Sequence, residues 1–329
     1  MEMGYRLNKA EAAAWFGALR ERYTVWAPVL FPRTGCYADT DVIRYAKVDS
    51  LEQIEFSKRS DYSFKETLLP IRETLFYFAE GQAIEPRRPE KPALIFLRAC
   101  EIHALKRLDA IYLHNGPADA YFARRREGVA LALIDCPTAC DTGFCRSMGT
   151  DRTDDWDMYL SPEGDGFRAD VRGELPMPEG TPCDLAPRFV SENNETVRVP
   201  ETLPKDIAGD PIWKEYDSRC VGCGRCNFVC PTCTCFTTQD VRTADNTSLC
   251  ERSRVWASCQ VDGYTDIAGG GSFRKTRADR MRFKVLHKIV DFKERFGYTM
   301  CVGCGRCDAV CPEYISYAAL LNRLSGRDA

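Results

Sequence analysis

The sequence predicts an α+β protein, with an α/β domain over residues 1–205 followed by a mainly helical domain over residues 206–329. Three observations support this: a strand–helix–strand pattern between residues 93 and 134, a polar stretch with three prolines between residues 199 and 211, and a cysteine motif that occurs twice after that stretch. A strand, a helix and a second strand in succession are typical of parallel sheets that helices cover. Prolines interrupt helices and strands, so the polar stretch is the expected domain boundary.

The N-terminal region is expected to begin with a helix. Asn8 and Glu11 have the spacing of a capping box, in which each side chain bonds the backbone N–H of the other residue. Trp15, Phe16 and Leu19 then fall on one helical face. Residues 24–45 contain two prolines and a glycine, which predict short strands and turns there.

Two short apolar runs, Ala93–Leu97 and Val129–Ile134, predict buried strands. Between them Ile102, Leu105 and Leu108 recur at helical spacing, and a polar loop follows. The pattern therefore predicts a strand–helix–strand unit whose two strands are parallel neighbours.

Cysteines follow both of these strands. Cys100 comes just after the first strand, Cys136 just after the second, and Cys140 and Cys145 lie in the same loop as Cys136. Carboxyl ends of parallel strands meet at one sheet edge, where α/β proteins bind ligands, so these four thiols predict a [4Fe–4S] cluster. Alternatives stay open: His103 could replace Cys140 as a ligand, the metal could be zinc, or some of the four could be free thiols.

The stretch from residue 149 to 207 is acidic and rich in proline and glycine. We expect Asp151, Asp154, Asp155 and Asp157 to form a solvated surface there.

The repeated cysteine motif reads C-x2-C-x2-C-x3-C-P and lies at residues 220–231 and 301–312. This is the spacing of bacterial ferredoxins, in which three thiolates of one run hold one [4Fe–4S] cluster and the fourth cysteine holds the other cluster. The ligands predicted for cluster 1 are Cys220, Cys223, Cys226 and Cys311. The ligands predicted for cluster 2 are Cys230, Cys301, Cys304 and Cys307. The C-terminal domain is therefore expected to be ferredoxin-like and to hold two clusters.

Four further cysteines follow the first run. Cys233 and Cys235 lie too close to Cys230 for all three to bind one set of irons. We expect the first two to pack around the cluster or hydrogen-bond to it rather than ligate it, and the alternative is that one of them replaces a predicted ligand. The roles of Cys250 and Cys259 stay open.

A strongly basic segment, Arg274 to Lys284, predicts a helix. Its charges would form an exposed helix face, neutralise the anionic clusters nearby or bind a negatively charged partner.

Composition and absent motifs limit the function. The chain has 329 residues, 18 cysteines, three histidines and a formal net charge of −3, so nothing indicates nucleic-acid binding. We find neither a secretory signal nor an apolar run of transmembrane length, and we expect a reduced, cytoplasmic protein with no membrane contact. No dinucleotide or Walker motif occurs, and His103, His114 and His287 belong to no catalytic motif. We predict no catalytic residue and no flavin or nicotinamide site in this chain, which is typical of an electron carrier.

The chain resembles two related groups of proteins: the A subunits of anaerobic sulfite reductases and the β subunits of cytosolic sulfhydrogenases. The residues that carry the resemblance are Arg98 to Leu105, Cys136, Phe144 to Gly149, Cys220 to Phe236, Trp256 to Cys259, Arg280 to Lys288, and Cys301 to Pro312. One departure is visible, because Gly143-Phe144-Cys145 stands where a Cys-Phe-Cys triplet is expected, and the additional thiol falls at Cys140.

The resemblance implies an iron–sulfur subunit that relays electrons from a flavin- and NAD(P)H-binding subunit to a catalytic subunit. We expect that catalytic subunit to be a sirohaem protein that reduces sulfite to sulfide, which would make this chain part of an anaerobic sulfite reductase. The alternative is the electron-transfer β subunit of a cytosolic nickel–iron hydrogenase or sulfhydrogenase.

Overall fold

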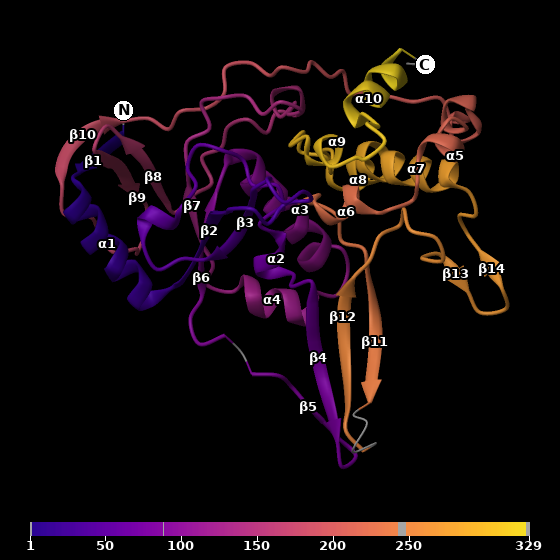
Figure 1. The fold of residues 1–329 in the computed structure, drawn as a ribbon, viewed down its shortest axis with the longest axis horizontal. Helices are drawn as coiled ribbons and strands as arrows, with labels where there is room; N and C mark the ends of the chain where they lie inside the picture. Colours follow the sequence, from indigo (N-terminus) through magenta and orange to yellow (C-terminus); the bar gives the residue numbers. More distant parts are fainter. Residues whose placement is uncertain (1, 88, 243–247, 327–329) are drawn as a thin grey trace. The chain divides into compact units, whose positions relative to one another are not determined.

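The computed structural model describes residues 2–87, 89–242 and 248–326. The chain forms two compact units, and each is built from separate pieces of the sequence (Figure 1). The first unit comprises Met1–Leu68, Arg88–Cys140 and Gly149–Asn193, and the second comprises Leu69–Arg87, Asp141–Met148 and Asn194–Ala329. The boundary expected between residues 205 and 206 stays a prediction, since the division into compact units follows Asn193 and assigns two earlier segments to the second unit.

An eight-stranded mixed sheet forms the centre of the first unit, in the order β10-β1-β9-β8-β7-β6-β2-β3. The neighbours β2, β6, β7 and β8 run parallel, and the remaining pairs are antiparallel. In chain order the strands are β1 (Glu2–Leu7), β2 (Thr24–Phe31), β3 (Val42–Lys47), β6 (Ala93–Leu97), β7 (Ala130–Leu133), β8 (Met158–Glu163), β9 (Gly166–Val171) and β10 (Thr181–Leu185). Its helices are α1 (Lys9–Arg22), α2 (Lys65–Leu68), α3 (Ala99–His114), α4 (Ala120–Arg126) and the short 3₁₀ turn Leu51–Gln53.

The predicted N-terminal helix is α1, and the predicted capping box is confirmed. The Asn8 side chain accepts a hydrogen bond from the Glu11 N–H at 3.0 Å, and the Glu11 carboxylate accepts one from the Asn8 N–H at 2.8 Å. Trp15, Phe16 and Leu19 are buried in the core against the sheet. The helix therefore starts where its cap satisfies two free N–H groups and is held by one apolar face.

The predicted strand–helix–strand unit is confirmed as β6, α3 and β7. Leu94 pairs with Ala130 and Leu97 with Leu133 in parallel register. All eight residues in the four pairings between β6 and β7 are buried, because strands covered on both faces need apolar side chains throughout. Cys100 and Cys136 therefore lie just beyond the carboxyl ends of two adjacent strands.

The acidic stretch contributes three strands that the sequence analysis did not predict. β8, β9 and β10 all lie between residues 149 and 207 and complete one side of the sheet. The expected solvated surface is wrong for Asp151, which is only 9% exposed. Asp157 accepts a hydrogen bond from the Leu131 N–H at 2.7 Å, so its carboxylate is part of the sheet's bonding.

The second unit contains a four-stranded antiparallel sheet in the order β11-β12-β4-β5, whose long strands run side by side in Figure 1. The strands are β4 (Arg72–Ala79), β5 (Gln82–Ile84), β11 (Phe236–Arg242) and β12 (Cys250–Trp256), and a separate hairpin joins β13 (Asp266–Ile267) to β14 (Gly271–Ser272). Glu73 lies directly opposite Arg254, and these two buried side chains form an ion pair at 2.6 Å.

The helices of the second unit pack around its own apolar core. They are α5 (Tyr216–Arg219), α6 (Arg225–Phe228), α7 (Arg277–Leu286), α8 (Phe292–Phe296), α9 (Arg306–Ala309) and α10 (Tyr317–Ser325), with a π-helical turn, η5 (His287–Asp291), between α7 and α8. Short 3₁₀ turns lie at Arg146–Met148, Ile207–Gly209 and Pro211–Trp213. The predicted α+β class agrees with this mixed architecture, but the mainly helical description of the C-terminal region omitted the four-stranded sheet. Strands β4 and β5 come from residues far upstream, so no local pattern after residue 206 could indicate that they complete this sheet.

No helix within residues 2–87, 89–242 and 248–326 is both long and apolar enough to cross a membrane.

The buried Glu73–Arg254 pair gives a stability prediction. Arg254→Leu should lower the free energy of unfolding by about 3–5 kcal/mol, because it leaves the Glu73 carboxylate buried without its counter-charge, whereas the double variant Glu73→Leu/Arg254→Leu should lose much less. Denaturant unfolding followed by circular dichroism measures both. The matched control is Arg252→Leu, whose partner Asp240 is exposed, and it should change the midpoint little. Equal losses in the single and double variants would contradict this role of the Glu73–Arg254 pair.

Candidate metal centres

The two cysteine runs fold into loops of the same conformation. In each loop a glycine in the left-handed region, Gly224 (φ 75°) or Gly305 (φ 70°), begins a four-residue helix, α6 or α9. Because a left-handed residue with a Cβ is strained, glycine is the residue that allows the chain to turn back there. The N–H that lies two residues after the first cysteine of each run points at that cysteine's sulfur, at 3.4 Å in both loops. Such N–H···S contacts are typical of iron–sulfur sites.

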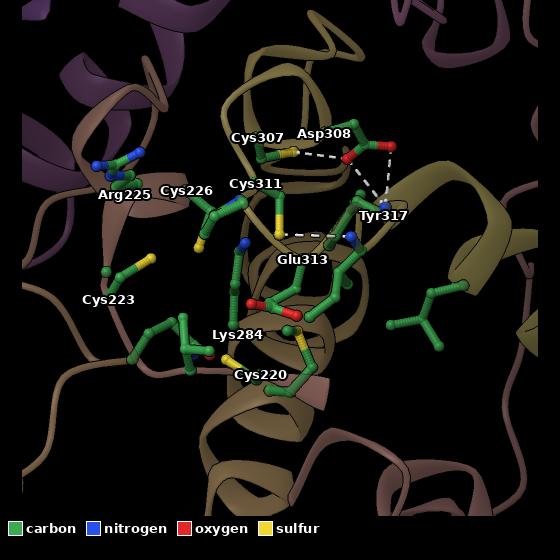
Figure 2. Close-up of a pocket in the computed structure, with 17 residues that line it drawn as sticks. Cys220, Cys223, Arg225, Cys226, Lys284, Cys307, Asp308, Cys311, Glu313 and Tyr317 are labelled. Carbon is green, nitrogen blue, oxygen red and sulfur yellow. Dashed lines mark hydrogen bonds between the residues drawn. The ribbon is translucent and has the colours of Figure 1, made fainter. Parts of the chain in front are cut away.

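The four cysteines predicted for cluster 1 line one cavity. Cys220, Cys223 and Cys226 come from the first loop, and Cys311 comes from the end of the second run. Figure 2 shows these thiols around the cavity together with Lys284. The Ile315 N–H donates to the Cys311 sulfur at 3.4 Å. The fourth cysteine of the distant run therefore joins the first loop, as the ferredoxin spacing predicts.

The four cysteines predicted for cluster 2 line a second cavity. Its wall contains Cys301, Cys304 and Cys307 from the second loop and Cys230 from the end of the first run. The two cavities have four lining residues in common, namely Cys226, Lys284, Cys307 and Tyr317. The two thiol sets therefore line adjacent cavities within the second unit, and these four residues form the wall that the cavities share.

A segment from an earlier part of the chain closes the second cavity. The Phe144 N–H donates to the Gly303 carbonyl at 2.7 Å, and the Thr142 hydroxyl donates to the Gly305 carbonyl at 2.8 Å. The fully buried Phe144 ring lines the cavity itself. Residues 141–148 thus cover the loop that carries Cys301 and Cys304.

Three thiols of these sets, Cys226, Cys301 and Cys307, are disfavoured as thiolates in the protein without a metal. Burial raises the pKa of Cys301 to about 12, and burial likewise raises the pKa of Cys226 and of Cys307. Coordination to a metal deprotonates a thiol outright and supplies positive charge, so a metal centre removes this cost. Two sets of four thiols, with backbone N–H groups directed at the sulfurs of Cys220, Cys301 and Cys311, fit two [4Fe–4S] clusters.

Two buried lysines provide further evidence for anionic centres. Burial alone would lower the pKa of Lys284, but the thiolates of Cys226 and Cys307 raise it well above its ordinary value. Lys288 is 4% exposed, and its ammonium group donates to the Cys230 sulfur at 3.5 Å and to the Thr232 hydroxyl at 3.0 Å. The two lysines are four residues apart, where helix α7 meets the π-helical turn.

The predicted basic helix is confirmed as α7, and its charges are divided between two environments. Arg280 and Lys284 are buried, whereas Lys275 near its start is exposed. The expectation of an exposed charged face is therefore wrong for the buried pair, and Lys284 has the neutralising position.

One buried hydroxyl also lacks a partner among the described residues. The Tyr317 ring lines both cavities and is 4% exposed, yet its hydroxyl makes no hydrogen bond there. A buried polar group without a partner costs free energy, and the sulfide of a bound cluster would accept its hydrogen bond.

The third predicted set is divided between the two compact units. Cys100, Cys136 and Cys140 belong to the first unit and Cys145 belongs to the second, so the ligand set stays a prediction. His103, the alternative ligand, bonds through Nε2 to the Arg152 carbonyl at 2.9 Å, and burial lowers its pKa.

The loop that carries Cys136 is nevertheless firmly held. The Cys136 N–H donates to the Arg188 carbonyl at 2.9 Å. The preceding Asp135 carboxylate is buried and accepts hydrogen bonds from the Tyr159 hydroxyl, the Ser161 hydroxyl and the Arg188 backbone N–H. Satisfied buried polar networks of this kind rigidify the segment that they hold.

Cys233, Cys235 and Cys259, to which sequence analysis assigned no ligand role, gather at a further cavity in the second unit. Cys233 is buried, and its thiol hydrogen-bonds to Cys230. This position beside a predicted ligand agrees with a packing role for Cys233. Cys259 is 24 residues downstream of Cys235, and no motif spacing could have brought the two together.

Comparison with known proteins identifies a 4Fe-4S dicluster domain over residues 219–315, which contains both cysteine runs. The whole chain is 30% identical, over 339 residues, to the sulfhydrogenase 2 subunit beta of Pyrococcus furiosus, and the match covers 97% of each protein. The chain belongs to the sulfhydrogenase β-subunit family. No solved structure matches it.

Membership of this family distinguishes between the two groups of proteins that the sequence resembles. The likeness to sulfhydrogenase β subunits is confirmed, whereas the preferred assignment to anaerobic sulfite reductase has no support from the comparisons. The dicluster domain supports [4Fe–4S] clusters as the cofactors of the second unit.

The close contact at Gly305 gives a test of the covering segment. A Cβ at Gly305 would collide with the Thr142 carbonyl, and the left-handed backbone would add strain of about 1–3 kcal/mol. Gly305→Ala should therefore lower iron content and thermal stability, as measured by iron quantitation and calorimetry. The matched control is Gly297→Ala, which has the same strain at φ 83° but open space around it, and it should keep its iron. Equal iron in the two variants would contradict a role for the segment 141–148.

The buried ammonium of Lys284 should raise the reduction potential of the neighbouring clusters. Lys284→Met removes a positive charge beside both cavities, so the midpoint potentials should become more negative by an amount on the order of tens of millivolts. Anaerobic redox titration followed by electron paramagnetic resonance measures the shift. Lys284→Arg, which keeps the charge, and Lys275→Met, on the exposed part of the basic segment, are the controls. Unchanged potentials in Lys284→Met at full iron content would refute this role.

Proposed function

We propose that this chain is the iron–sulfur electron-transfer subunit of a hetero-oligomeric, cytoplasmic oxidoreductase of the sulfhydrogenase type. Family membership supports the class of complex, and the dicluster domain supports the cofactors. The observation that carries the proposal is the common wall of the two thiol cavities, formed by Cys226, Lys284, Cys307 and Tyr317.

Adjacent cavities suit electron transfer rather than catalysis. When bound, two [4Fe–4S] clusters supply one-electron redox chemistry over a wide range of potentials. The chain's own residues would hold cluster 1 with Cys220, Cys223, Cys226 and Cys311, and cluster 2 with Cys230, Cys301, Cys304 and Cys307. Lys284 and Lys288 would compensate the cluster charge, and the apolar lining would keep water away from the sulfurs.

The partners that we propose follow from the resemblance to known electron-transfer subunits and from membership of the sulfhydrogenase β-subunit family. Electrons would be exchanged with a flavin- and NAD(P)H-binding subunit on one side and with a nickel–iron catalytic subunit on the other. A third [4Fe–4S] cluster at Cys100, Cys136, Cys140 and Cys145, with His103 as the alternative to Cys140, would add a third redox centre to the chain. The strands β6 and β7 support this site because they bring Cys100 and Cys136 to neighbouring strand ends.

An anaerobic sulfite reductase complex is the second candidate. The residues from Arg98 to Leu105 and from Cys220 to Phe236 support it by resemblance. Metal analysis of the complex purified through this chain separates the two, because a hydrogenase partner brings nickel and a sulfite reductase partner brings sirohaem with its visible absorption.

Iron quantitation and turnover test the relay. If the chain holds three clusters, the wild-type protein should contain about twelve irons. A content of about eight irons would show that the third cluster is absent. Cys223→Ala should lose about four irons and stop turnover driven by NAD(P)H, while the catalytic subunit should still work with an artificial electron donor. Cys250→Ser, on β12 and outside both cavities, is the control and should behave as wild type. Unimpaired NAD(P)H-driven turnover in Cys223→Ala would overturn the relay.

A further inference from the structure

A cavity of about 210 Å³ in the second unit contains thiols that the two predicted clusters do not use. It is lined by Asn227, Cys233, Thr234, Cys235, Cys259, Tyr264, Arg274, Phe283, Lys284, His287, Lys288 and Met300. Its volume exceeds that needed for a few water molecules, so a small ligand or part of a larger one can enter. The cavity thus presents nucleophilic sulfur to a bound molecule.

Sheet pairing holds two of these thiols together. Cys235 immediately precedes β11 and Cys259 follows β12, and the Ala257 N–H donates to the Cys235 carbonyl at 3.0 Å, which extends the β11–β12 pairing by one step. The side chains of Cys235 and Cys259 are hydrogen-bonded to each other. The contact is therefore built into the backbone and does not depend on one flexible side chain.

The surroundings of the two sulfurs differ, so the two thiols are chemically distinct. Cys259 is 4% exposed, and its sulfur accepts hydrogen bonds from the Asn227 side-chain amide at 3.1 Å and from the Gln260 amide at 3.8 Å. The hydrogen bond from the Cys235 thiol is the main cause that lowers the pKa of Cys259 to about 6, while the same bond raises the pKa of Cys235. Of the two, Cys259 is the thiol that is favoured as the thiolate, and Cys235 is the one that is favoured as the proton donor.

The rest of the cavity wall carries positive charge. The Arg274 guanidinium lies over the Phe283 ring at 3.5 Å, and both residues line the cavity beside the buried ammonium groups of Lys284 and Lys288. Cationic side chains next to a thiolate favour an anionic ligand.

We propose that Cys259 and Cys235 form a dithiol centre that reduces small anionic disulfides by thiol–disulfide exchange. The Cys259 thiolate attacks one sulfur of the substrate, which forms a mixed disulfide and releases one substrate thiolate. Cys235 then gives up its proton and attacks the Cys259 sulfur, which forms the Cys235–Cys259 disulfide and releases the second substrate half as a thiol. One disulfide bond breaks and one forms, and two electrons pass from the cysteine pair to the substrate. This activity goes beyond the proposed electron relay and does not require it.

The experiment uses the full, cluster-loaded chain under argon with bis(2-sulfonatoethyl) disulfide as the probe. After quenching by alkylation, peptide mass spectrometry should find a cross-link between residues 226–242 and 255–274 that joins Cys235 to Cys259. Cys235→Ser should instead retain the probe as a stable adduct on Cys259. Cys259→Ser should react at least about tenfold more slowly, because the nucleophile is gone. The matched control is Cys250→Ser, which should form the cross-link as wild type does.

The charge of the probe tests the cavity wall. The neutral bis(2-hydroxyethyl) disulfide has the same S–CH2–CH2 arms without the sulfonate charges and should react several-fold more slowly than the sulfonate, and Arg274→Gln should remove most of that preference. Iron content is measured on every variant and should stay at the wild-type value, which separates this centre from the clusters.

Two results would overturn the proposal. One is a wild-type protein whose Cys235 and Cys259 both remain free thiols after excess probe. The other is a loss of about four irons in Cys259→Ser or Cys235→Ser, which would make that cysteine a cluster ligand instead.

Discussion

The second unit depends on one constraint, which is that the negative charge on its buried cysteine sulfurs must be balanced by positive charge nearby. Eight cysteine thiols line two adjacent cavities whose walls are mostly apolar, where an isolated thiolate is disfavoured. The ammonium groups of Lys284 and Lys288 enter the same interior, and buried lysines need an anionic partner. The positive ammonium groups and the negative sulfurs lower each other's cost of burial, so the lysines and the thiol sets form one electrostatic system. The π-helical turn after α7 lies at this point, in keeping with the frequent occurrence of such turns at functional sites.

The exchange of the fourth cysteine ties together distant parts of the chain. Cys311 joins the loop around Cys220, and Cys230 joins the loop around Cys301, so neither cavity can be completed by one run alone. Residues 141–148, inserted from an earlier part of the sequence, close the second cavity through backbone hydrogen bonds to Gly303 and Gly305. Metal binding and folding of this unit are expected to be strongly coupled, because the ligands come together only in the folded chain.

Asn227 links the two kinds of sulfur chemistry that we assign to this unit. It follows the predicted ligand Cys226 directly, and its amide donates to the Cys259 sulfur of the dithiol centre. Its side-chain oxygen accepts from the Cys233 thiol at 3.5 Å. The Asn227 amide therefore orients the thiols of Cys259 and Cys233, which line the cavity of the dithiol centre. Asn227 is 1% exposed, and these hydrogen bonds satisfy its buried polar atoms.

The sequence by itself determined the features that depend on local spacing. The capping box of Asn8 and Glu11, the pair of strands around α3 and the two ferredoxin runs follow from periodicities of a few residues, because caps, apolar faces and cluster loops are built from near neighbours. The spacing also predicts that Cys311 belongs with the cysteines of the first run and Cys230 with those of the second, because in ferredoxin repeats the fourth cysteine of each run binds the other cluster. The family of the chain required comparison of its whole length, because the same cluster loops serve several terminal acceptors.

Only the tertiary structure decided the features that join distant segments. The sheet of β11, β12 and β4 crosses more than 150 residues of sequence, and its Glu73–Arg254 pair (|i−j| 181) has no local signature. The burial of Lys284 could not be read from a basic segment that could equally have been an exposed face, and Lys288 lies four residues beyond that segment. The pairing of Cys235 with Cys259 depends on the register of β11 against β12, and a register is set by long-range pairing and packing rather than by the composition of either strand.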